Sequence, residues 1–453
     1  MNVVNPATGE RVEAYTEHDE GDVEEALARS EAAFEDWRTR SVRDRERLLA
    51  NAADVLRANK REYAETMTRE MGKPISQAIG EVEKCAWVCD HYAKHASAYL
   101  GADHHPSPPG STVTTEHEPL GPVLAVMPWN FPFWQVFRFA APYLTAGNVG
   151  ILKHASNVPG CALAIEEVFR EAGYPDDVFQ SLLIPSDLVD DLLTDDRIRA
   201  ATLTGSGPAG RAVAASAGDQ LKKTVLELGG SDPFVVLDDA DVSAAAETGA
   251  WARNLNGGQS CIAAKRFVVH TDAYDAFLDA LTDEIDALAV GDPTDEATDV
   301  GPQARADLME ALHEQVTASV DAGATLVTGG EPLDCEGAFY PPTILTDVPE
   351  GCPVDTEETF GPVATVYEVA DEAEAIATAN DTEFGLGASV WTEDRDRGKR
   401  VASRIDAGCV YVNQLVKSDP RVPFGGVKDS GYGRELSEAG IKEFVNRKTV
   451  WVE

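Results

Sequence analysis

The sequence predicts an α/β protein built on parallel β-sheets, and three observations lead to that class. Short apolar strands alternate with helical segments from residue 121 onward. The alternation restarts after the stretch ELGGSDPFVVL at 227–237, which indicates a second α/β unit. The chain has 453 residues, and single cores stop growing near roughly 250–300 residues, so two or three domains are expected. Each unit is expected to form a parallel sheet with right-handed crossovers.

The first hundred residues are helical in pattern, with three segments expected in series at 22–37, 41–72 and 75–100. Ser41 is placed to cap the second helix, and Gly72 followed by Pro74 is placed to end it. The segment DHHPSPPG at 103–110 breaks the pattern, and STVTTEHEP at 111–119 alternates like a strand.

Strands and helices then alternate along the chain. The strands expected in the first unit lie at 121–130, 149–155, 177–185 and 197–206. The helices expected there lie at 161–173 and 212–218. The second unit is expected to begin with a helix at 242–256, a strand at 266–270 and a helix at 274–288. The chain ends in the short strand KTVWVE, for which pairing with a neighbouring subunit is one expectation.

Charge is the most unusual feature of the composition. The chain has 38 Lys and Arg residues against 78 Asp and Glu residues, which gives a formal net charge of −40. Nucleic acid and anionic membranes are therefore poor partners. The acidic residues are dispersed, and molar salt shortens the Debye length to about 3 Å, so we expect a halophilic protein. An unusually acidic mesophilic protein is the alternative.

A cytoplasmic location is expected. No run of about 18 apolar residues predicts a transmembrane helix, and the first residues, MNVVNPATGERVEAY, lack the pattern of a signal peptide. The seven cysteines form no CxxC pair, and Cys85 and Cys89 have no further ligands at zinc spacing. Reduced thiols and no metal site are expected.

One cysteine lies in a run of small and polar residues, NLNGGQSCIAAKR at 254–266. A catalytic thiol needs room for a carbonyl, and it needs donors for the oxyanion formed on attack. Gly257 and Gly258 leave that room, and a helix-like segment starting at Cys261 would present its backbone N–H. On this stretch alone, an inert cysteine buried in a tight turn is an equally good interpretation.

Two polar residues elsewhere are candidates for the same chemistry. Glu227, in VLELGGSDP, precedes two glycines and can act as a mobile general base. Taken alone, a solvated acid at a strand end is the better interpretation. Asn130, in VMPWNFPFW, ends a buried strand in a rigid frame, where it either donates to an oxyanion or caps a helix.

The stretch LTGSGPAGR at 203–211 joins a strand to a helix. Gly205 and Gly210 are spaced GxxxxG, and such a turn can place a phosphate on the N–H groups of a helix. The stretch lacks both the GK[ST] ending of a P-loop and the GxGxxG fingerprint, so alone it is a weak signal.

Together, MPWNFP, TGS, ELGG, NGGQSC, EETFGPV and PFGGVKDSGYGRE resemble the aldehyde dehydrogenase superfamily in order and spacing, over essentially the whole chain. LKHASNVPGCALAIEEVF, GGQSCIAAKRFVV and VKSDPRVPFGG look closest to the shorter, NADP-type succinate-semialdehyde dehydrogenases. The resemblance implies two Rossmann-related parallel-sheet domains and a small β element that forms a homodimer or homotetramer. The implied parts are a dinucleotide-binding domain at 1–106 and 120–229, a catalytic domain at 230–430, and an oligomerisation element at 107–119 and 431–453.

The resemblance also implies catalytic roles. Cys261 stands at the family's nucleophile and would form a thiohemiacetal and then a thioester. The Asn130 amide and the Cys261 backbone N–H would hold the oxyanion, and Glu227 would activate water for deacylation. The implied reaction is NAD(P)-dependent oxidation of an aldehyde to a carboxylate, with succinate semialdehyde and NADP favoured.

Eight residues match the family's cofactor-binding positions: Trp129, Lys153, Ser156, Gly205, Ser206, Leu228, Glu358 and Phe360. Members that prefer NAD often have Glu three residues after the lysine. Here that residue is Ser156, which leaves space and a donor for a 2′-phosphate. NADP is therefore favoured, with NAD as a second cofactor; a merely permissive serine is the alternative.

Arg138 is the main candidate for substrate binding. It lies eight residues after Asn130, where related semialdehyde dehydrogenases hold the distal carboxylate with an arginine fork. An internal salt bridge is the alternative, because a charge in an apolar run needs a partner. Ser418 would add a hydroxyl contact, and Arg421 is a weaker candidate.

Two positions depart from the family's pattern. His154 stands where proline is usual, and Ser260 stands where some relatives have a second cysteine, which puts their disulfide switch in doubt here. The open alternatives are another ω-carboxy or aliphatic aldehyde, a CoA-acylating enzyme, and a non-catalytic member. Retention of Glu227 argues against CoA as acyl acceptor. Retention of Cys261, Glu227 and Asn130 together argues against a non-catalytic member.

Overall fold

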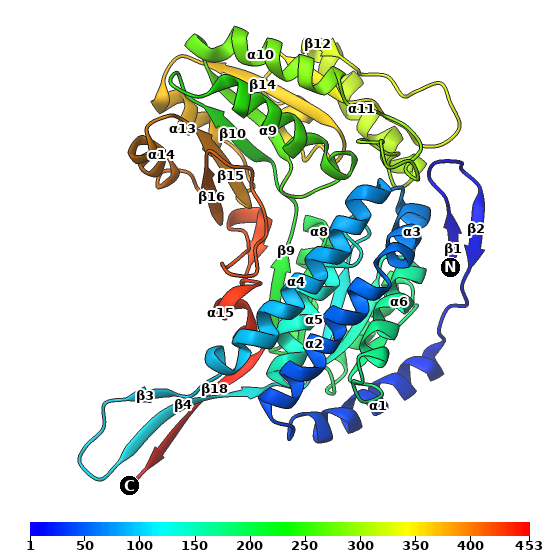
Figure 1. The fold of residues 1–453 in the computed structure, drawn as a ribbon, viewed down its shortest axis with the longest axis vertical. Helices are drawn as coiled ribbons and strands as arrows, with labels where there is room; N and C mark the ends of the chain where they lie inside the picture. The colour runs from blue at the N-terminus through cyan, green and yellow to red at the C-terminus, as the bar shows by residue number, and fades with distance from the viewer.

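The computed structural model describes residues 1–453 and contains two large β-sheets, one above the other in Figure 1. The first has the strand order β17-β9-β8-β5-β6-β7. Its strands are β5 (Pro122–Met127), β6 (Val149–His154), β7 (Phe179–Ser181), β8 (Ala200–Thr204), β9 (Lys223–Glu227) and β17 (Gly431–Tyr432). Strands β5 to β9 are parallel and only β17 is antiparallel, so the expected parallel α/β sheet is confirmed.

The order of these strands explains where a ligand can bind. The chain leaves the centre of the sheet through β6 and β7, then crosses back and continues through β8 and β9, which is the Rossmann order. Ligands bind at the carboxyl ends of the strands where that order reverses. The reversal lies between β5 and β8, which lead into Asn130 and Gly205.

Helices pack around the first sheet; the sequence patterns predicted most of them, but they missed the helices at 134–146 and 189–194 and merged two others. They are α1 (Glu20–Trp37), α2 (Val42–Ala58), α3 (Lys60–Met71), α4 (Ile75–Tyr99), α5 (Trp134–Ala146), α6 (Pro159–Glu171), α7 (Val189–Thr194) and α8 (Gly207–Asp219). The single helix expected at 41–72 is two helices that meet at Asn59, because α2 and α3 each pack against α4. The caps are as expected: the Ser41 hydroxyl accepts the Asp44 N–H at 3.1 Å, and α3 ends at Gly72 with φ 76°.

The second large sheet has the order β12-β13-β14-β11-β10-β15-β16. Its strands are β10 (Asp232–Val236), β11 (Ala264–His270), β12 (Thr325–Thr328), β13 (Thr343–Thr346), β14 (Val363–Val369), β15 (Gly387–Trp391) and β16 (Cys409–Val412). Its helices are α9 (Val242–Asn254), α10 (Thr271–Asp286), α11 (Ala306–Ala322), α12 (Pro353–Thr356), α13 (Glu372–Asn380) and α14 (Arg395–Ala402). The five strands from β14 to β16 repeat the Rossmann order, and only β12 is antiparallel.

A three-stranded sheet projects from the body of the molecule (Figure 1). It contains β3 (Asp103–His105), β4 (Thr112–Pro119) and β18 (Val445–Val452). The terminal strand β18 pairs with β4 of the same chain, from Val445 opposite Pro119 to Val452 opposite Thr112. Its partner is thus internal, while Trp451 on it stays 55% exposed.

Two further elements complete the chain: the hairpin of β1 (Asn2–Val4) and β2 (Arg11–Ala14), and the short helix α15 (Ser437–Ile441). Sequence patterns did not predict the hairpin. None of the helices combines the length and the apolar character that crossing a membrane requires. The domain boundaries expected from the sequence stay a prediction.

Candidate active site

The predicted site residues gather where the two large sheets face each other. The carboxyl ends of β5, β6, β8 and β9 lead into Asn130, Lys153, Gly205 and Glu227. Cys261 lies just before the amino end of β11. Figure 1 shows β9 pointing from the first sheet toward the second. The carboxyl ends of strands in the first sheet therefore meet the amino end of β11 in the second sheet.

The chain reaches Cys261 through a tight turn. Asn256, Gly257 and Gly258 have φ values of 59°, 62° and 72°, a left-handed conformation that glycine adopts readily. A Cβ at Gly258 would clash with the backbone of Gly361, which explains the lack of bulk there. The buried Arg253 guanidinium donates to the carbonyl oxygens of Gly258 and Gly361, both at 2.6 Å. Arg253 therefore holds the turn at Gly258 against the backbone at Gly361.

The helix expected to start at Cys261 is absent. Cys261 lies in a turn closed by the Ala263 N–H, which donates to the Ser260 carbonyl at 3.2 Å, and strand β11 begins at Ala264. The parallel pairing of β11 with β10 and β14 outweighs local helix propensity. Burial raises the pKa of the Cys261 thiol to about 12, although the nearby charges of Arg138 and Lys265 oppose the shift.

Asn130 lies against the same turn. Its side-chain Nδ2 donates to the main-chain carbonyl of Gln259 at 3.0 Å, and its main-chain carbonyl accepts a hydrogen bond from the Asn256 side-chain amide at 2.7 Å. The residue is buried, and its side-chain oxygen has no partner. Two residues from the turn thus hold Asn130 beside the nucleophile candidate.

Glu227 is the last residue of β9, and it is buried with no partner for either carboxylate oxygen. It is therefore not the solvated strand-end acid of the alternative interpretation. Burial raises the pKa of its carboxyl to about 8, and the neighbouring Glu435 adds to the rise. The positive charges of Arg138 and Arg434 act in the opposite direction. A carboxyl with a pKa near neutrality is suited to general-base chemistry.

Lys265 is a site residue that the sequence analysis missed. Its buried ammonium donates to the carbonyls of Gly230 at 2.6 Å and Cys261 at 2.9 Å, and to Glu358 Oε1 at 2.8 Å. Glu358 Oε1 also accepts the Gly230 N–H at 3.1 Å. One lysine thus links the thiol turn, the glycine loop after Glu227 and a predicted cofactor residue. The Lys265–Arg266 pair at the start of a strand that continues as Phe-Val-Val was the available signal.

The residues predicted to hold the cofactor line the other side of the site. The rings of Trp129 and Phe360 meet at right angles, with centroids 5.7 Å apart, and Leu228 is buried behind Gly210. Ser206 precedes α8, and its side chain makes no capping hydrogen bond, so the N–H groups of this 13-residue helix remain available to an anion.

Lys153 fits a phosphorylated nucleotide. Its ammonium contacts the Ser186 hydroxyl at 3.2 Å and no carboxylate within 4.0 Å. Desolvation lowers the pKa of Lys153, which a bound phosphate would reverse. Ser156 is exposed in the turn after β6, so space for an added group exists beside it. Ser186 was not predicted.

A cavity of about 80 Å³ opens at Cys261 and is lined by Lys84, Phe131, Trp134, Gln135, Arg138, Ala252, Leu255, Ser260, Cys261, Ile262, Leu415, Val416, Lys417, Ser418 and Phe424. The lining contains three cationic residues and no carboxylate. In a chain with 78 acidic and 38 basic residues, that composition is far from the average. The cavity therefore suits an anionic ligand.

Arg138 and Ser418, the residues predicted to bind the substrate, both line this cavity, and Arg138 is already paired. Its guanidinium forms a buried ion pair with Glu435, lies 4.9 Å above the Phe424 ring, and has Nη2 3.4 Å from the Thr204 hydroxyl. The internal salt bridge given as the alternative is therefore present. Arg421 does not reach the cavity, because it pairs with Asp419 and lies over Trp87.

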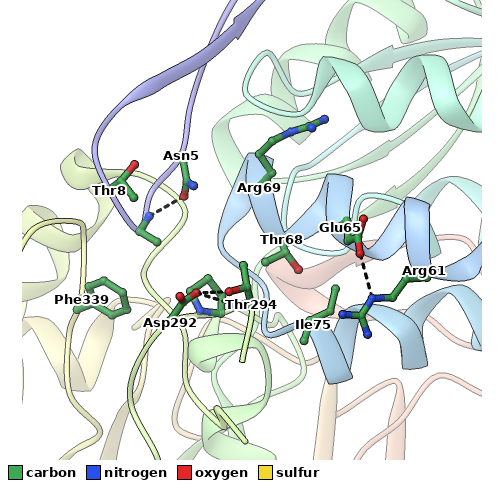
Figure 2. A pocket seen from close by; sticks show the side chains of 12 residues that line it. Asn5, Thr8, Arg61, Glu65, Thr68, Arg69, Ile75, Asp292, Thr294 and Phe339 are labelled. Carbon is green, nitrogen blue, oxygen red and sulfur yellow. Dashed lines mark hydrogen bonds and ion pairs between the residues drawn. The ribbon is translucent and has the colours of Figure 1, made fainter. Parts of the chain in front are cut away.

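A second cavity of about 560 Å³ lies away from the thiol (Figure 2). It is formed by the β1–β2 hairpin, α3 and the loop around Asp292. Its arginines already have acidic partners: Arg61 pairs with Glu65 and Glu296, and Arg69 lies 3.9 Å from Glu13. None of the predicted site residues lines it.

Comparison with known proteins places this geometry in context. The model of the aldehyde dehydrogenase family matches residues 1–450. A probable succinate-semialdehyde dehydrogenase [NADP(+)] of Synechocystis is 52% identical over 449 residues, covering 99% of each chain. The succinate-semialdehyde dehydrogenase [NADP(+)] of Mycolicibacterium paratuberculosis is 52% identical over 99% of this chain and 96% of its own. The succinic semialdehyde dehydrogenase of Streptococcus pyogenes, solved with NADP+, is 37% identical with a TM-score of 0.97 over 100% and 99% of the chains.

Proposed function

The chain belongs to the aldehyde dehydrogenase family, and on that premise we propose that it oxidises succinate semialdehyde to succinate with NADP. The overall reaction consumes the aldehyde, NADP+ and water, and it yields the carboxylate, NADPH and two protons. One observation carries the choice of substrate: the cavity at Cys261 is lined by three cationic residues and by no acidic one.

Carbon–sulfur bond formation begins the reaction. The Cys261 thiolate attacks the aldehyde carbon and gives a thiohemiacetal. The Asn130 side-chain amide and the Cys261 backbone N–H donate to the oxyanion. Burial raises the pKa of the Cys261 thiol to about 12, and the positive charges of Arg138 and Lys265 oppose that rise and so favour the thiolate.

NADP supplies the acceptor for the hydride that leaves the thiohemiacetal, which then becomes a thioester. Lys153 and Ser156 would hold the adenosine end of the cofactor, and Gly205 and Ser206 would hold its phosphates at the start of α8. Glu358, held by Lys265, would bind the nicotinamide ribose, and Trp129, Leu228 and Phe360 would border the nicotinamide. Because Ser156 replaces an acid and Lys153 has no carboxylate partner, the site favours NADP over NAD.

Glu227 completes the cycle as the general base for hydrolysis. Water attacks the thioester, Glu227 takes its proton, and the carbon–sulfur bond breaks to release the carboxylate. A buried carboxyl with free oxygens favours water as the acyl acceptor over CoA.

The remaining proposals concern the setting of the enzyme. We infer a homodimer or homotetramer built through β4 and β18, since the edge strand β18 keeps Trp451 and Val452 exposed. A cytoplasmic location fits the seven free cysteines. Adaptation to molar salt fits the net charge of −40.

The deciding test is NADPH formation from succinate semialdehyde in molar KCl, with NAD and propanal as comparisons. The proposal expects a higher kcat/KM for the semialdehyde with NADP than for any other pair. Equal use of propanal would leave a general aliphatic aldehyde dehydrogenase. No reduction of either cofactor by any aldehyde would indicate a non-catalytic member.

A further inference from the structure

Lys84 is a cation in the substrate cavity that has no anionic partner. It projects from α4 and remains partly exposed at the cavity lining. Its ammonium donates to the Ser418 hydroxyl at 2.9 Å and lies 4.2 Å from the centre of the Trp134 ring. No carboxylate oxygen lies within 4.0 Å of it.

Neighbouring lysines differ from Lys84 in this respect. Lys60 pairs with Glu83 at 2.6 Å, and the buried Lys73 pairs with Glu81. Among the other two cations of the cavity lining, Arg138 forms an ion pair with Glu435, and Lys417 is exposed to solvent. Lys84 is thus the partly buried cation of the lining whose charge is not neutralised by an acidic side chain.

Ser418 adds a second donor beside Lys84. Its hydroxyl oxygen accepts hydrogen bonds from the Lys84 ammonium and from the Trp134 indole N–H, at 2.9 and 3.0 Å. A hydroxyl has two acceptor lone pairs and one proton. Both lone pairs are used, so the Ser418 proton remains free to donate to a ligand.

We propose that Lys84, together with Ser418, binds the distal carboxylate of the substrate and so determines the preference for an ω-carboxy aldehyde. This inference rests on the proposed oxidation of a semialdehyde at Cys261. Lys84 supplies the charge, Ser418 supplies a directed O–H, and Arg138 adds a charge already shared with Glu435. A substrate carboxylate at this position would give Lys84 an anionic partner, which no side chain of the protein supplies.

The charge state of Lys84 makes the preference depend on pH. Desolvation, followed by the positive charge of Arg138, lowers the pKa of the Lys84 ammonium to about 8. The other groups that face it are Glu81 and Cys85, which raise its pKa, and Lys73, which lowers it. Below pH 8 the free enzyme carries the ammonium and attracts a carboxylate, whereas above pH 8 the neutral amine does not.

The test compares succinate semialdehyde with pentanal, an uncharged aldehyde of similar length, using NADP and the full-length enzyme. Lys84→Met should lower the ratio of kcat/KM for the semialdehyde to that for pentanal by about 10- to 100-fold, mainly through KM of the semialdehyde. Lys84→Arg should retain most of the ratio. Lys94→Met, which removes an exposed lysine from the same helix, is the matched control and should leave the ratio unchanged.

The wild-type pH profile gives a second measurement that needs no variant. The same ratio should fall as the pH rises through about 8, because shared titrations such as that of Cys261 cancel in it. A Lys84→Met enzyme that kept the wild-type ratio, or a wild-type ratio independent of pH from 7 to 10, would overturn the assignment. A wild-type enzyme with no preference for the semialdehyde would instead refute the proposed substrate.

Discussion

The proposed active site has two halves, a cofactor half around Lys153 and Ser206 and a thiol half around Cys261, and they are built from different kinds of structure. The cofactor half uses strand ends and main-chain N–H groups: Lys153 is the penultimate residue of β6, and α8 begins with free donors after Ser206. The thiol half is assembled from side chains far apart in sequence, including Lys84 on α4, Arg138 on α5 and Ser418 near the C-terminus. The cofactor half repeats what a Rossmann sheet offers to any dinucleotide.

This difference indicates that the thiol half, and not the cofactor half, determines which reaction is catalysed. Main-chain donors at a helix start recognise phosphate whatever the side chains are. The thiol half depends on buried charges whose partners are fixed by packing. Substitutions in the thiol half should therefore affect the chemical step or the choice of aldehyde, whereas those in the cofactor half should affect binding of the cofactor.

Removal of the nucleophile gives the sharpest separation of the two halves. Cys261→Ala should reduce turnover by at least about 10⁴-fold, because no other group can form the thioester. NADP affinity, measured by fluorescence titration, should change little, since the cofactor half is intact. Substantial remaining dehydrogenase activity would contradict the assigned mechanism.

Glu227→Gln should slow turnover by about 10²–10⁴-fold while a first-turnover burst of NADPH remains. In the wild type, kcat should rise with pH through about 8, because only the ionised carboxylate acts as a base. Loss of the burst along with turnover would mean that Glu227 acts before the thioester forms.

The same carboxyl predicts a pH effect on stability. The unfolded carboxyl loses its proton near pH 4.5, whereas the folded one keeps it until about pH 8. Stability from this group is therefore complete below pH 4.5 and lost as the pH rises through 8. The midpoint of urea unfolding should therefore decrease between pH 6 and pH 9, and the decrease should be smaller in Glu227→Gln than in the wild type.

Lys265→Met tests the residue that joins the two halves. The substitution leaves Glu358 without its cation and should cost about 3 kcal/mol of stability, the low end for a broken buried pair, since Glu358 keeps 21% of its side chain exposed. KM for NADP should rise as well, because Glu358 loses its orientation. Lys265→Arg is the control, and a loss of stability with unchanged NADP kinetics would assign Lys265 a purely structural role.

The smallest effect is expected at the edge of the cofactor half. Ser156→Glu should weaken NADP by about tenfold through repulsion of the 2′-phosphate, the scale of one unfavourable charge contact. NAD should be affected much less, so the ratio of the two kcat/KM values should shift toward NAD. An unchanged ratio would mean that Ser156 is merely a permissive residue.

The alternation of strands and helices and the two α/β units could be predicted from the sequence, because apolar periodicity and glycine-rich turns are local properties. The roles of Cys261, Glu227 and Asn130 came from the order and spacing of the whole motif set, because each stretch alone left an alternative open. The sequence did not reveal the break at Asn59 or the turn at Cys261, where packing and strand pairing outweigh local propensity. Three features could be seen only in the folded molecule: Arg138 pairs with Glu435, Lys265 joins three segments, and Lys84 has no carboxylate partner. An ion pair depends on which charges the fold brings together, and the spacing of residues along the chain does not give those distances.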